Sequence, residues 1–221
     1  MALRLILLGP PASGKGTQGR RVAGREGLGY LSTGALLREA MEAGGELGEE
    51  VRPVLARGEY VSDETMCRII MPWLETNDAK GWVLDGFPRS PAQDDFLTEW
   101  LGSRHRRVTA ALALEVPKTE LVRRIGDRVE CRECRWSGSR SEAASTKGCP
   151  ACGGFVGPRE DDDLENFLKR HDEFILHTVP VIERYAAEGN LIRCNATDEI
   201  EAVAGRLAEQ IDRLKNDGQK A

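Results

Sequence analysis

The chain has 221 residues, of which 30% are charged and 40% hydrophobic, and its formal net charge is −5. This balance is typical of a soluble globular protein, and no apolar run approaches the roughly 20 residues that a membrane helix needs. Lysines and arginines are scattered along the chain, so we expect small anionic ligands and no nucleic-acid partner. The apolar stretch Leu5 to Leu8 is too short for a signal-peptide core. We therefore predict a cytoplasmic protein that does not reside in a membrane.

Short apolar runs alternate with helical patterns along the chain. Runs rich in leucine, valine and alanine predict buried strands at 3–8, 28–31, 82–84, 108–115 and 191–194. Helices are predicted from about Thr17 onward, after a cap at Ser32 and Thr33, and near the C-terminus, where apolar residues recur with helical spacing. This alternation predicts a single α/β domain, residues 1–221, built on a doubly wound parallel five-stranded sheet. The polar tail 215–221 is expected to fray.

The segment from Cys131 to Pro158 departs from this alternation. It shows neither a helical nor a strand period, and it contains two prolines and four cysteines besides several glycines. A segment with so few apolar residues does not fold by burial, so we expect an insertion that something other than a hydrophobic core holds together.

The four cysteines of this segment form two C-x-x-C pairs separated by fourteen residues: Cys131 with Cys134, and Cys149 with Cys152. This spacing is close to that of a four-cysteine zinc ribbon, in which each pair aims two thiolates at one ion. We therefore predict a closed, structural Zn²⁺ site, with two local disulfides or a rubredoxin-type iron site as alternatives. Cys67 and Cys194 lie in apolar segments and are predicted to be small buried side chains.

A glycine-rich loop, GPPASGKGT, follows the first predicted strand at residues 9–17. It matches G-x-x-x-x-G-K-[ST] except for one glycine between the lysine and the threonine. In such a loop the backbone N–H groups converge on phosphate oxygens, and the next helix adds its positive N-terminus. Lys15 would bridge the β- and γ-phosphates, and the Thr17 hydroxyl would hold Mg²⁺; a glycine-rich turn without a ligand is the alternative. The predicted phosphate-binding residues are Gly9, Pro11, Ser13, Gly14, Lys15, Gly16 and Thr17.

Several further blocks of the sequence resemble the signature blocks of adenylate kinases. They are the G-K-G-T variant of the loop, Leu31-Ser32-Thr33-Gly34, and Asp85-Gly86-Phe87-Pro88-Arg89 with Gln93 four residues later. The resemblance extends over nearly the whole chain through Arg124, Arg128, Arg159, Asp161, Asp162, Arg170 and Thr178-x-Pro180. It implies a P-loop core, a helical monophosphate-binding insertion at about 32–61, and a lid at about 124–163 that closes over ATP. It also implies Mg²⁺-dependent conversion of ATP and AMP to two ADP, and we expect a monomer.

The resemblance assigns roles to individual side chains, and the chemistry of phosphoryl transfer supports those roles. The reaction needs alignment and neutralisation of spreading negative charge, which a guanidinium supplies by forking onto two oxygens. Arg38 and Arg89 are assigned to the acceptor phosphate. The donor phosphates and the transferred group are assigned to Arg124, Arg128, Arg159 and Arg170. Contacts with AMP are assigned to Thr33, Arg38, Gly86, Arg89, Gln93, Arg159 and Arg170, with Thr33 and Gln93 on the adenine.

Acidic residues complete the expected site. Asp85 ends a buried strand, where an unpaired carboxylate is costly, so it is predicted to hold Mg²⁺ through the waters of the ion. A turn aspartate before Gly86 is the alternative. Asp161 and Asp162 are predicted to position the lid through its arginines, or else to belong to a solvated acidic run.

Three positions depart from the family pattern. Ala12 stands where many relatives have glycine, and we expect it to keep helical-region dihedrals. Ala35 replaces the aspartate that often follows S-T-G, and Arg135 follows the first cysteine pair where glycine is usual. None of these changes touches Lys15 or the arginines with assigned roles.

Two other functions remain as alternatives to an adenylate kinase. The first is a kinase for a different nucleoside monophosphate, since the acceptor assignment depends mainly on Thr33 and Gln93. The second is a non-enzymatic nucleotide-binding or zinc-ribbon module. A ribbon that bound nucleic acid would carry clustered basic and aromatic residues, whereas residues 131–152 contain Trp136 and charges of both signs.

Overall fold

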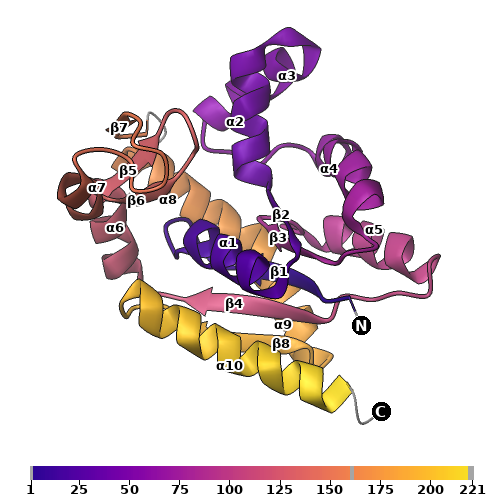
Figure 1. Ribbon diagram of the computed structural model, residues 1–221. Coiled ribbons are helices and arrows are strands. Elements are labelled where there is room, and N and C mark those ends of the chain that lie inside the picture. Colours follow the sequence, from indigo (N-terminus) through magenta and orange to yellow (C-terminus); the bar gives the residue numbers. More distant parts are fainter. Residues whose placement is uncertain (1, 160–161, 219–221) are drawn as a thin grey trace.

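A computed structural model describes residues 2–159 and 162–218. Its main sheet has five parallel strands in the order β2-β3-β1-β4-β8 (Figure 1). The strands are β1 (Arg4–Leu8), β2 (Gly29–Ser32), β3 (Trp82–Asp85), β4 (Ala110–Glu115) and β8 (Leu191–Asn195). All five predicted strands are present, and the prediction of a doubly wound α/β fold is confirmed.

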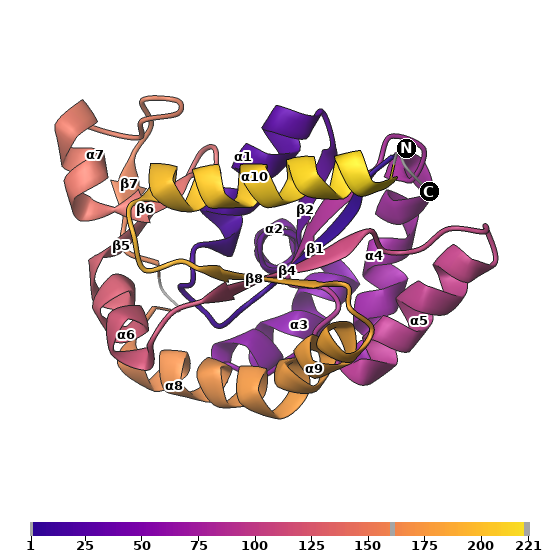
Figure 2. The same ribbon diagram turned by 90° about the horizontal axis from the view of Figure 1, so that it is seen from below.

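Helices cover both faces of the sheet (Figures 1 and 2). One face packs against α1 (Lys15–Glu26) and α10 (Ile200–Gly218), and the other packs against α4 (Asp63–Asn77), α5 (Pro91–Gly102) and α9 (Val179–Ala187). Strand β1 contributes side chains to the apolar clusters on both faces of the sheet, because Leu5 and Leu7 face α1 while Ile6 and Leu8 face α4 and α5. This strand lies in the middle of the sheet, so the loop that follows it opens near the centre of the carboxyl edge.

The C-terminal helix is longer than the sequence indicated. Fraying was expected from residue 215, but α10 continues to Gly218, and residues 219–221 lie outside the described part of the chain. Lys215 explains the difference, because its ammonium pairs with Glu26 of α1 at 2.8 Å and with Asp212 at 3.3 Å. No helix in the described ranges is long and apolar enough to cross a membrane.

Two insertions project from the carboxyl edge of the sheet. The helical insertion, residues 32–61, contains α2 (Thr33–Ala43) and α3 (Gly45–Ala56). The cysteine insertion, residues 128–157, lies between α6 (Lys118–Asp127) and α8 (Leu164–Glu173), and α8 continues through a π-helical turn, η1 (Phe174–Thr178), into α9. Figure 1 shows the two insertions on the same side of the sheet.

The cysteine insertion is more regular than predicted. It forms a small antiparallel sheet of β5 (Arg128–Cys131), β6 (Ser137–Ser139) and β7 (Val156–Gly157), with one helix, α7 (Arg140–Thr146). A capping box starts α7: the Ser139 hydroxyl accepts from the Glu142 N–H, and the Glu142 carboxylate accepts from the Ser139 N–H. The expected lack of an apolar core is confirmed among the described residues, since no member of the three buried apolar clusters comes from this segment.

Candidate active site

The loop between β1 and α1 closes around the side chain of Lys15. The Lys15 ammonium donates to the carbonyl oxygens of Gly9, at 2.7 Å, and Pro10, at 2.8 Å. Gly14 has a φ of +95° and is the N-cap of α1. The expectation for Ala12 is wrong, because its φ is +64°. Successive N–H groups converge on one point where right- and left-handed residues alternate, and a left-handed alanine costs about 1 kcal/mol.

The seven phosphate-binding residues predicted from the glycine-rich motif lie in this loop or in the first turn of α1: Gly9, Pro11, Ser13, Gly14, Lys15, Gly16 and Thr17. The Ser13 hydroxyl is buried and has no hydrogen-bond partner among the described residues. A buried polar group of this kind is normally satisfied. Ser13 therefore offers a hydrogen bond to a ligand in the loop.

Positive charge gathers around Lys15. Burial lowers the pKa of the Lys15 ammonium to about 8, against the opposing charge of Asp85. Three guanidinium groups add to the lowering: Arg89, Arg170 and Arg128. The positive field of these three guanidinium groups, which disfavours a further proton on Lys15, attracts an anion such as phosphate.

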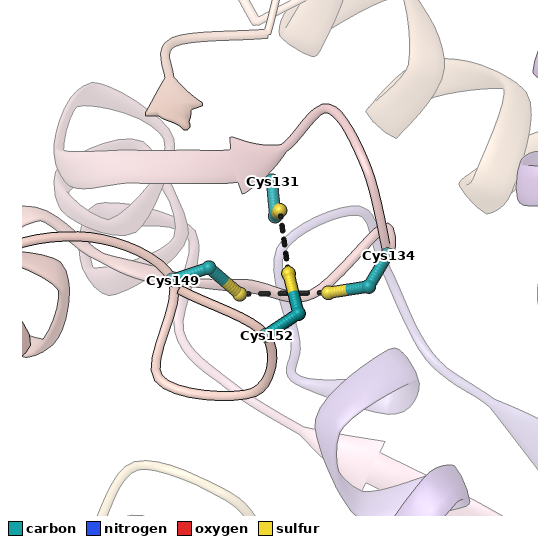
Figure 3. A group of neighbouring side chains, drawn as sticks. All are labelled: Cys131, Cys134, Cys149 and Cys152. Carbon is teal, nitrogen blue, oxygen red and sulfur yellow. Dashed lines mark hydrogen bonds between the residues drawn. The ribbon is translucent and has the colours of Figure 1, made fainter. Parts of the chain in front are cut away.

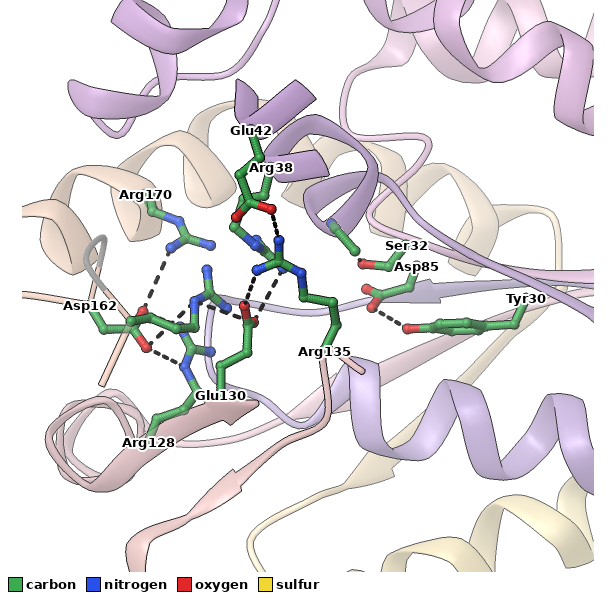
Figure 4. Close-up of polar contacts among 12 residues, drawn as sticks. Tyr30, Ser32, Arg38, Glu42, Asp85, Arg128, Glu130, Arg135, Asp162 and Arg170 are labelled. Carbon is green, nitrogen blue, oxygen red and sulfur yellow. Dashed lines mark hydrogen bonds and ion pairs between the residues drawn. The ribbon is translucent and has the colours of Figure 1, made fainter. Parts of the chain in front are cut away.

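Asp85 ends β3 at the carboxyl edge of the sheet, and Tyr30 of β2 binds its carboxylate (Figure 4). The Tyr30 hydroxyl donates to Asp85 Oδ2 at 2.9 Å. The Thr33 hydroxyl donates to the Gly86 carbonyl at 2.8 Å and lies 3.3 Å from the Asp85 carbonyl. The site therefore forms where ligands bind in open α/β sheets, at the carboxyl ends of neighbouring strands.

Two buried carboxylates organise a cluster of arginines beside the loop (Figure 4). Asp162 pairs with Arg128 and lies within 4.0 Å of Arg159 and Arg170. Glu130, in β5, lies within 3.7 Å of Arg38, Arg135 and Arg159. Five guanidinium groups thus come from α2, the neighbourhood of the cysteine insertion and α8 to meet two acidic side chains. This excess of positive charge fits a polyphosphate. Each guanidinium can donate hydrogen bonds to two phosphate oxygens at once.

The four paired cysteines converge on one point (Figure 3). Their sulfurs all lie within 4.8 Å of one another, and two contacts, 3.6 Å for Cys131–Cys152 and 3.4 Å for Cys134–Cys149, run between the two pairs. Four sulfurs about 2.3 Å from one zinc ion would lie about 3.8 Å apart, so the spacing fits one tetrahedral site. All four thiols are free, which does not agree with two local disulfides.

The backbone near Cys149 favours its ionised form. The Ala151 N–H donates to Cys149 Sγ at 3.4 Å. Although burial opposes the change, backbone N–H groups of Ala151 and Cys152 lower the pKa of Cys149 to about 7. A thiolate is the form that binds zinc, so this turn is suited to a metal ligand.

Comparison with known proteins agrees with this geometry. The family model described as "Adenylate kinase" matches residues 7–190. The adenylate kinase of Archaeoglobus fulgidus is 36% identical over 217 residues, 97% of this chain and 100% of that protein. The adenylate kinase of Paracoccus denitrificans is 38% identical over 217 residues, 97% of this chain and 99% of that protein. The chain belongs to the adenylate kinase family.

The adenylate kinase resemblance inferred from the sequence motifs is thereby confirmed. Of the arginines that it assigned to the donor side, Arg128, Arg159 and Arg170 lie in the cluster around Asp162. Arg124 instead donates to Glu120 at 2.8 Å and to the Ala196 carbonyl at 2.8 Å. These contacts place it where α6 meets the segment after β8.

Arg89 lies on the acceptor side of the expected site. Its Nε donates to the Gly86 carbonyl at 2.8 Å, and its guanidinium stacks on the Tyr60 ring, 4.6 Å from the centroid. The Thr178 hydroxyl donates to the Arg89 carbonyl at 3.0 Å. Arg89 is thus held between the helical insertion and the π-helical turn. Gly86 leaves the room for this arrangement, since a Cβ there would lie 2.6 Å from Thr33 Oγ1 and 2.8 Å from the Arg89 guanidinium.

Gln93 and Thr33, the residues assigned to adenine, are both buried. Gln93 Oε1 accepts from the Arg89 N–H at 2.8 Å, and Gln93 Nε2 donates to Asp63 Oδ1 at 2.8 Å. An amide offers two donors and two acceptor lone pairs, so one of each stays available for a base.

Other polar residues of the site have no recognisable signal in the sequence. Tyr30, Glu42 and Glu130 lie in stretches whose pattern indicates only a strand or a solvated helix face, and nothing in their spacing distinguishes them. In the sequence Arg135 differs from the usual pattern only in replacing glycine, yet it pairs with both Glu42 and Glu130. Asp162 agrees with its predicted role of binding lid arginines, whereas Asp161 lies outside the described residues.

Proposed function

We propose that the protein transfers a phosphoryl group reversibly between ATP and AMP, giving two ADP, between a lid at about 124–163 and a monophosphate-binding insertion at about 32–61. The single observation that supports this best is the convergence of five guanidinium groups on the carboxylates of Glu130 and Asp162. Two of the five, Arg128 and Arg170, also act on the charge of Lys15. The five arginines come from α2 of the helical insertion, from the cysteine insertion and its flank, and from α8. A donor beside the cysteine insertion and an acceptor beside the helical insertion would place the transferred group between them.

The carboxylates act as internal substitutes for phosphate when no nucleotide is bound. Their side chains are at most 9% exposed, and an unpaired arginine at this depth would be costly. Nucleotide phosphates carry more charge than two carboxylates, so they take over the guanidinium groups on binding. Lys15 then stabilises the charge that develops between the β- and γ-phosphates, with Arg38 and Arg89 on the acceptor phosphate.

Two metal ions fit the residues present. Mg²⁺ would be held by ATP, the Thr17 hydroxyl and, through its waters, Asp85; when bound it supplies charge neutralisation at the β- and γ-phosphates. Zn²⁺ would be held by the four lid cysteines, where no position stays open for catalysis. Its contribution is to keep the lid folded, so that Arg128 and Arg159 are presented to the nucleotide.

The acceptor base is proposed to be adenine, bound by Thr33 and by the free half of the Gln93 amide. We propose that the protein acts as a monomer and that it is located in the cytoplasm.

The direct test measures ADP formation from ATP plus AMP with purified protein in a coupled assay. Turnover that requires both nucleotides and Mg²⁺ supports the proposal. ATP binding without any transfer to AMP, CMP, UMP or GMP would instead identify a nucleotide-binding protein without kinase activity.

A further inference from the structure

The hydroxyl of Tyr30 makes a contact that the proposed reaction does not yet account for. It donates to Asp85 Oδ2 over 2.9 Å, and neither residue's backbone is involved (Figure 4). Asp85 is the carboxylate proposed to hold Mg²⁺. The contact therefore reaches the metal side of the site from a strand to which no catalytic role has been assigned.

The sheet register explains why a tyrosine is suited to this position. Tyr30 of β2 lies level with Val83 of β3, whereas Ser32 lies level with Asp85. Two residues of strand separate Tyr30 from the level of Asp85, a rise of about 6.6 Å. A hydroxyl attached directly to Cβ at position 30 would fall short of the carboxylate, while the phenol spans the gap along the sheet.

The Tyr30 ring is fixed in place by α1, the helix that follows the phosphate loop. A Cβ on Gly19 would lie 2.7 Å from the ring, so the helix backbone packs directly against it. The Arg20 guanidinium lies 5.0 Å from the ring centroid on the same helix. At Gly16, a Cβ would lie 3.7 Å from Asp85 Oδ2 and 3.8 Å from the Tyr30 hydroxyl, so the bonded pair lies beneath the first turn of α1.

The phenol hydroxyl of Tyr30 has one proton, and it donates that proton to Asp85 Oδ2. The bond holds one oxygen of the carboxylate in place and thereby sets the direction in which Oδ1 points.

We propose that Tyr30 is a positioning residue: its hydroxyl fixes the carboxylate of Asp85 in the orientation that receives the waters of an ATP-bound Mg²⁺ ion. The inference rests on the proposed role of Asp85. Residues that orient metal-binding groups commonly matter about tenfold or more for metal affinity or activity. Because the ring belongs to the packing between β2 and α1, the same residue links the position of the phosphate loop to that of the metal carboxylate.

The test uses Tyr30→Phe, which keeps the ring packing and removes only the hydroxyl. Mn²⁺ serves as the probe: its affinity for the preformed complex of the full chain with ATP is measured from the electron paramagnetic resonance signal of free Mn²⁺. We expect Tyr30→Phe to weaken Mn²⁺ binding by roughly tenfold. The affinity for ATP in the presence of a chelator should be unchanged, and kcat with Mg²⁺ should fall by about the same factor as the Mn²⁺ affinity.

Tyr185→Phe is the matched control. The Tyr185 hydroxyl also donates to a buried carboxylate, Asp94 Oδ1, at 2.7 Å, but this pair joins α9 to α5 away from the phosphate loop. Its loss should leave Mn²⁺ affinity at the wild-type value. Equal weakening by both variants would overturn the inference, because any lost tyrosine–carboxylate bond would then have the same effect.

Asp85→Asn separates failure of the inference from failure of the proposed metal site. If Asp85→Asn weakens Mn²⁺ binding while Tyr30→Phe matches the wild type, the positioning role of Tyr30 is wrong and the metal site stands. If Asp85→Asn itself leaves Mn²⁺ affinity unchanged, both the metal role of Asp85 and the inference fail.

Discussion

The guanidinium of Arg135, in the turn after the first cysteine pair, pairs with the carboxylate of Glu42 at the end of α2 (Figure 4). The same side chain lies 3.3 Å from Glu130 of β5. Arg135 has a φ of +61°, in the left-handed region where glycine is the usual residue. The chain thus accepts backbone strain at a position from which one side chain connects the cysteine insertion to the helical insertion.

We expect Glu42→Gln to favour the open arrangement of these two insertions. The Glu42 side chain is 60% exposed, so the ion pair is worth at most about 1 kcal/mol, or about fivefold in the closing equilibrium. KM for ATP and AMP should rise by up to that factor, while kcat stays level or rises if opening limits turnover. Steady-state kinetics at low salt measure the effect, and high salt should reduce it.

Arg135→Gly is the companion variant. It loses the same ion pair and the contact with Glu130, and it relieves the left-handed strain, which is worth about 1 kcal/mol. The two variants should therefore share the rise in KM, whereas only Arg135→Gly should make the cysteine insertion more resistant to limited proteolysis. Wild-type KM values in both variants at low salt would show that the contact does not influence closure.

Lys15→Met should abolish phosphoryl transfer and stabilise the nucleotide-free protein at neutral pH. The folded-state pKa of Lys15 is about 8, against 10.5 for an unperturbed lysine, so the charged form is disfavoured in the fold by up to about 3 kcal/mol. Loss of the bonds to the Gly9 and Pro10 carbonyls offsets this by about 1 kcal/mol each. A net gain of about 1 kcal/mol remains.

The difference in free energy of unfolding between the wild type and Lys15→Met should change with pH in one direction. Between pH 8 and pH 10.5 the unfolded wild type binds more protons at Lys15 than the folded protein, so its free energy of unfolding rises with pH relative to Lys15→Met. The advantage of the variant is complete below pH 8 and gone above pH 10.5. Urea unfolding of both proteins at several pH values measures this, and a difference that does not vary with pH would contradict the pKa shift.

The strands and the phosphate loop could be predicted from the sequence because local patterns determine them. Leu5 to Leu8 form an apolar run that only a buried strand accommodates, and the glycines of the loop occur where the backbone must bend. The contacts of Glu130 could not be predicted in this way, since they join residues far apart in the chain. The left-handed Ala12 was missed because its conformation follows from loop closure, which propensity does not report. Regular structure in the cysteine insertion was missed because its strands are short and lack an apolar face.

Removal of zinc should unfold the cysteine insertion before the rest of the protein. Its buried apolar side chains are few, namely Val129, Cys131, Ala143 and Cys149. Metal binding therefore supplies most of its folding free energy. We expect a chelator, or Cys134→Ser, to expose residues 128–157 to protease while the main sheet retains its unfolding transition. Elemental analysis checks the metal, and one zinc per chain is the expected content. Metal-free protein whose insertion resists protease would contradict this prediction.

Gln93→Ala should lower turnover of AMP much more than binding of ATP. Gln93 is 2% exposed, and its amide bridges the Arg89 N–H and Asp63. Truncation leaves both partners short of one hydrogen bond, at a cost of about 1 to 3 kcal/mol in stability. The remaining donor and acceptor of the amide match the adjacent acceptor and donor on one edge of adenine. A site that bonds one base leaves buried groups unpaired with another, so discrimination should be steep.

The decisive measurement compares kcat/KM for AMP, CMP, UMP and GMP with ATP as donor, in the wild type, Gln93→Ala and Gln93→Glu. Gln93→Glu keeps an oxygen for the Arg89 N–H but offers no amide donor to Asp63 or to a base. If Gln93 binds adenine, both variants should lose activity selectively with AMP, and the preference among the four acceptors should flatten. An equal loss with all four would mean that Gln93 acts through Arg89 and the fold instead. A wild type that prefers a pyrimidine nucleotide would overturn the choice of AMP and leave phosphoryl transfer intact, because the phosphate-binding roles proposed for Lys15 and the arginine cluster do not depend on the base.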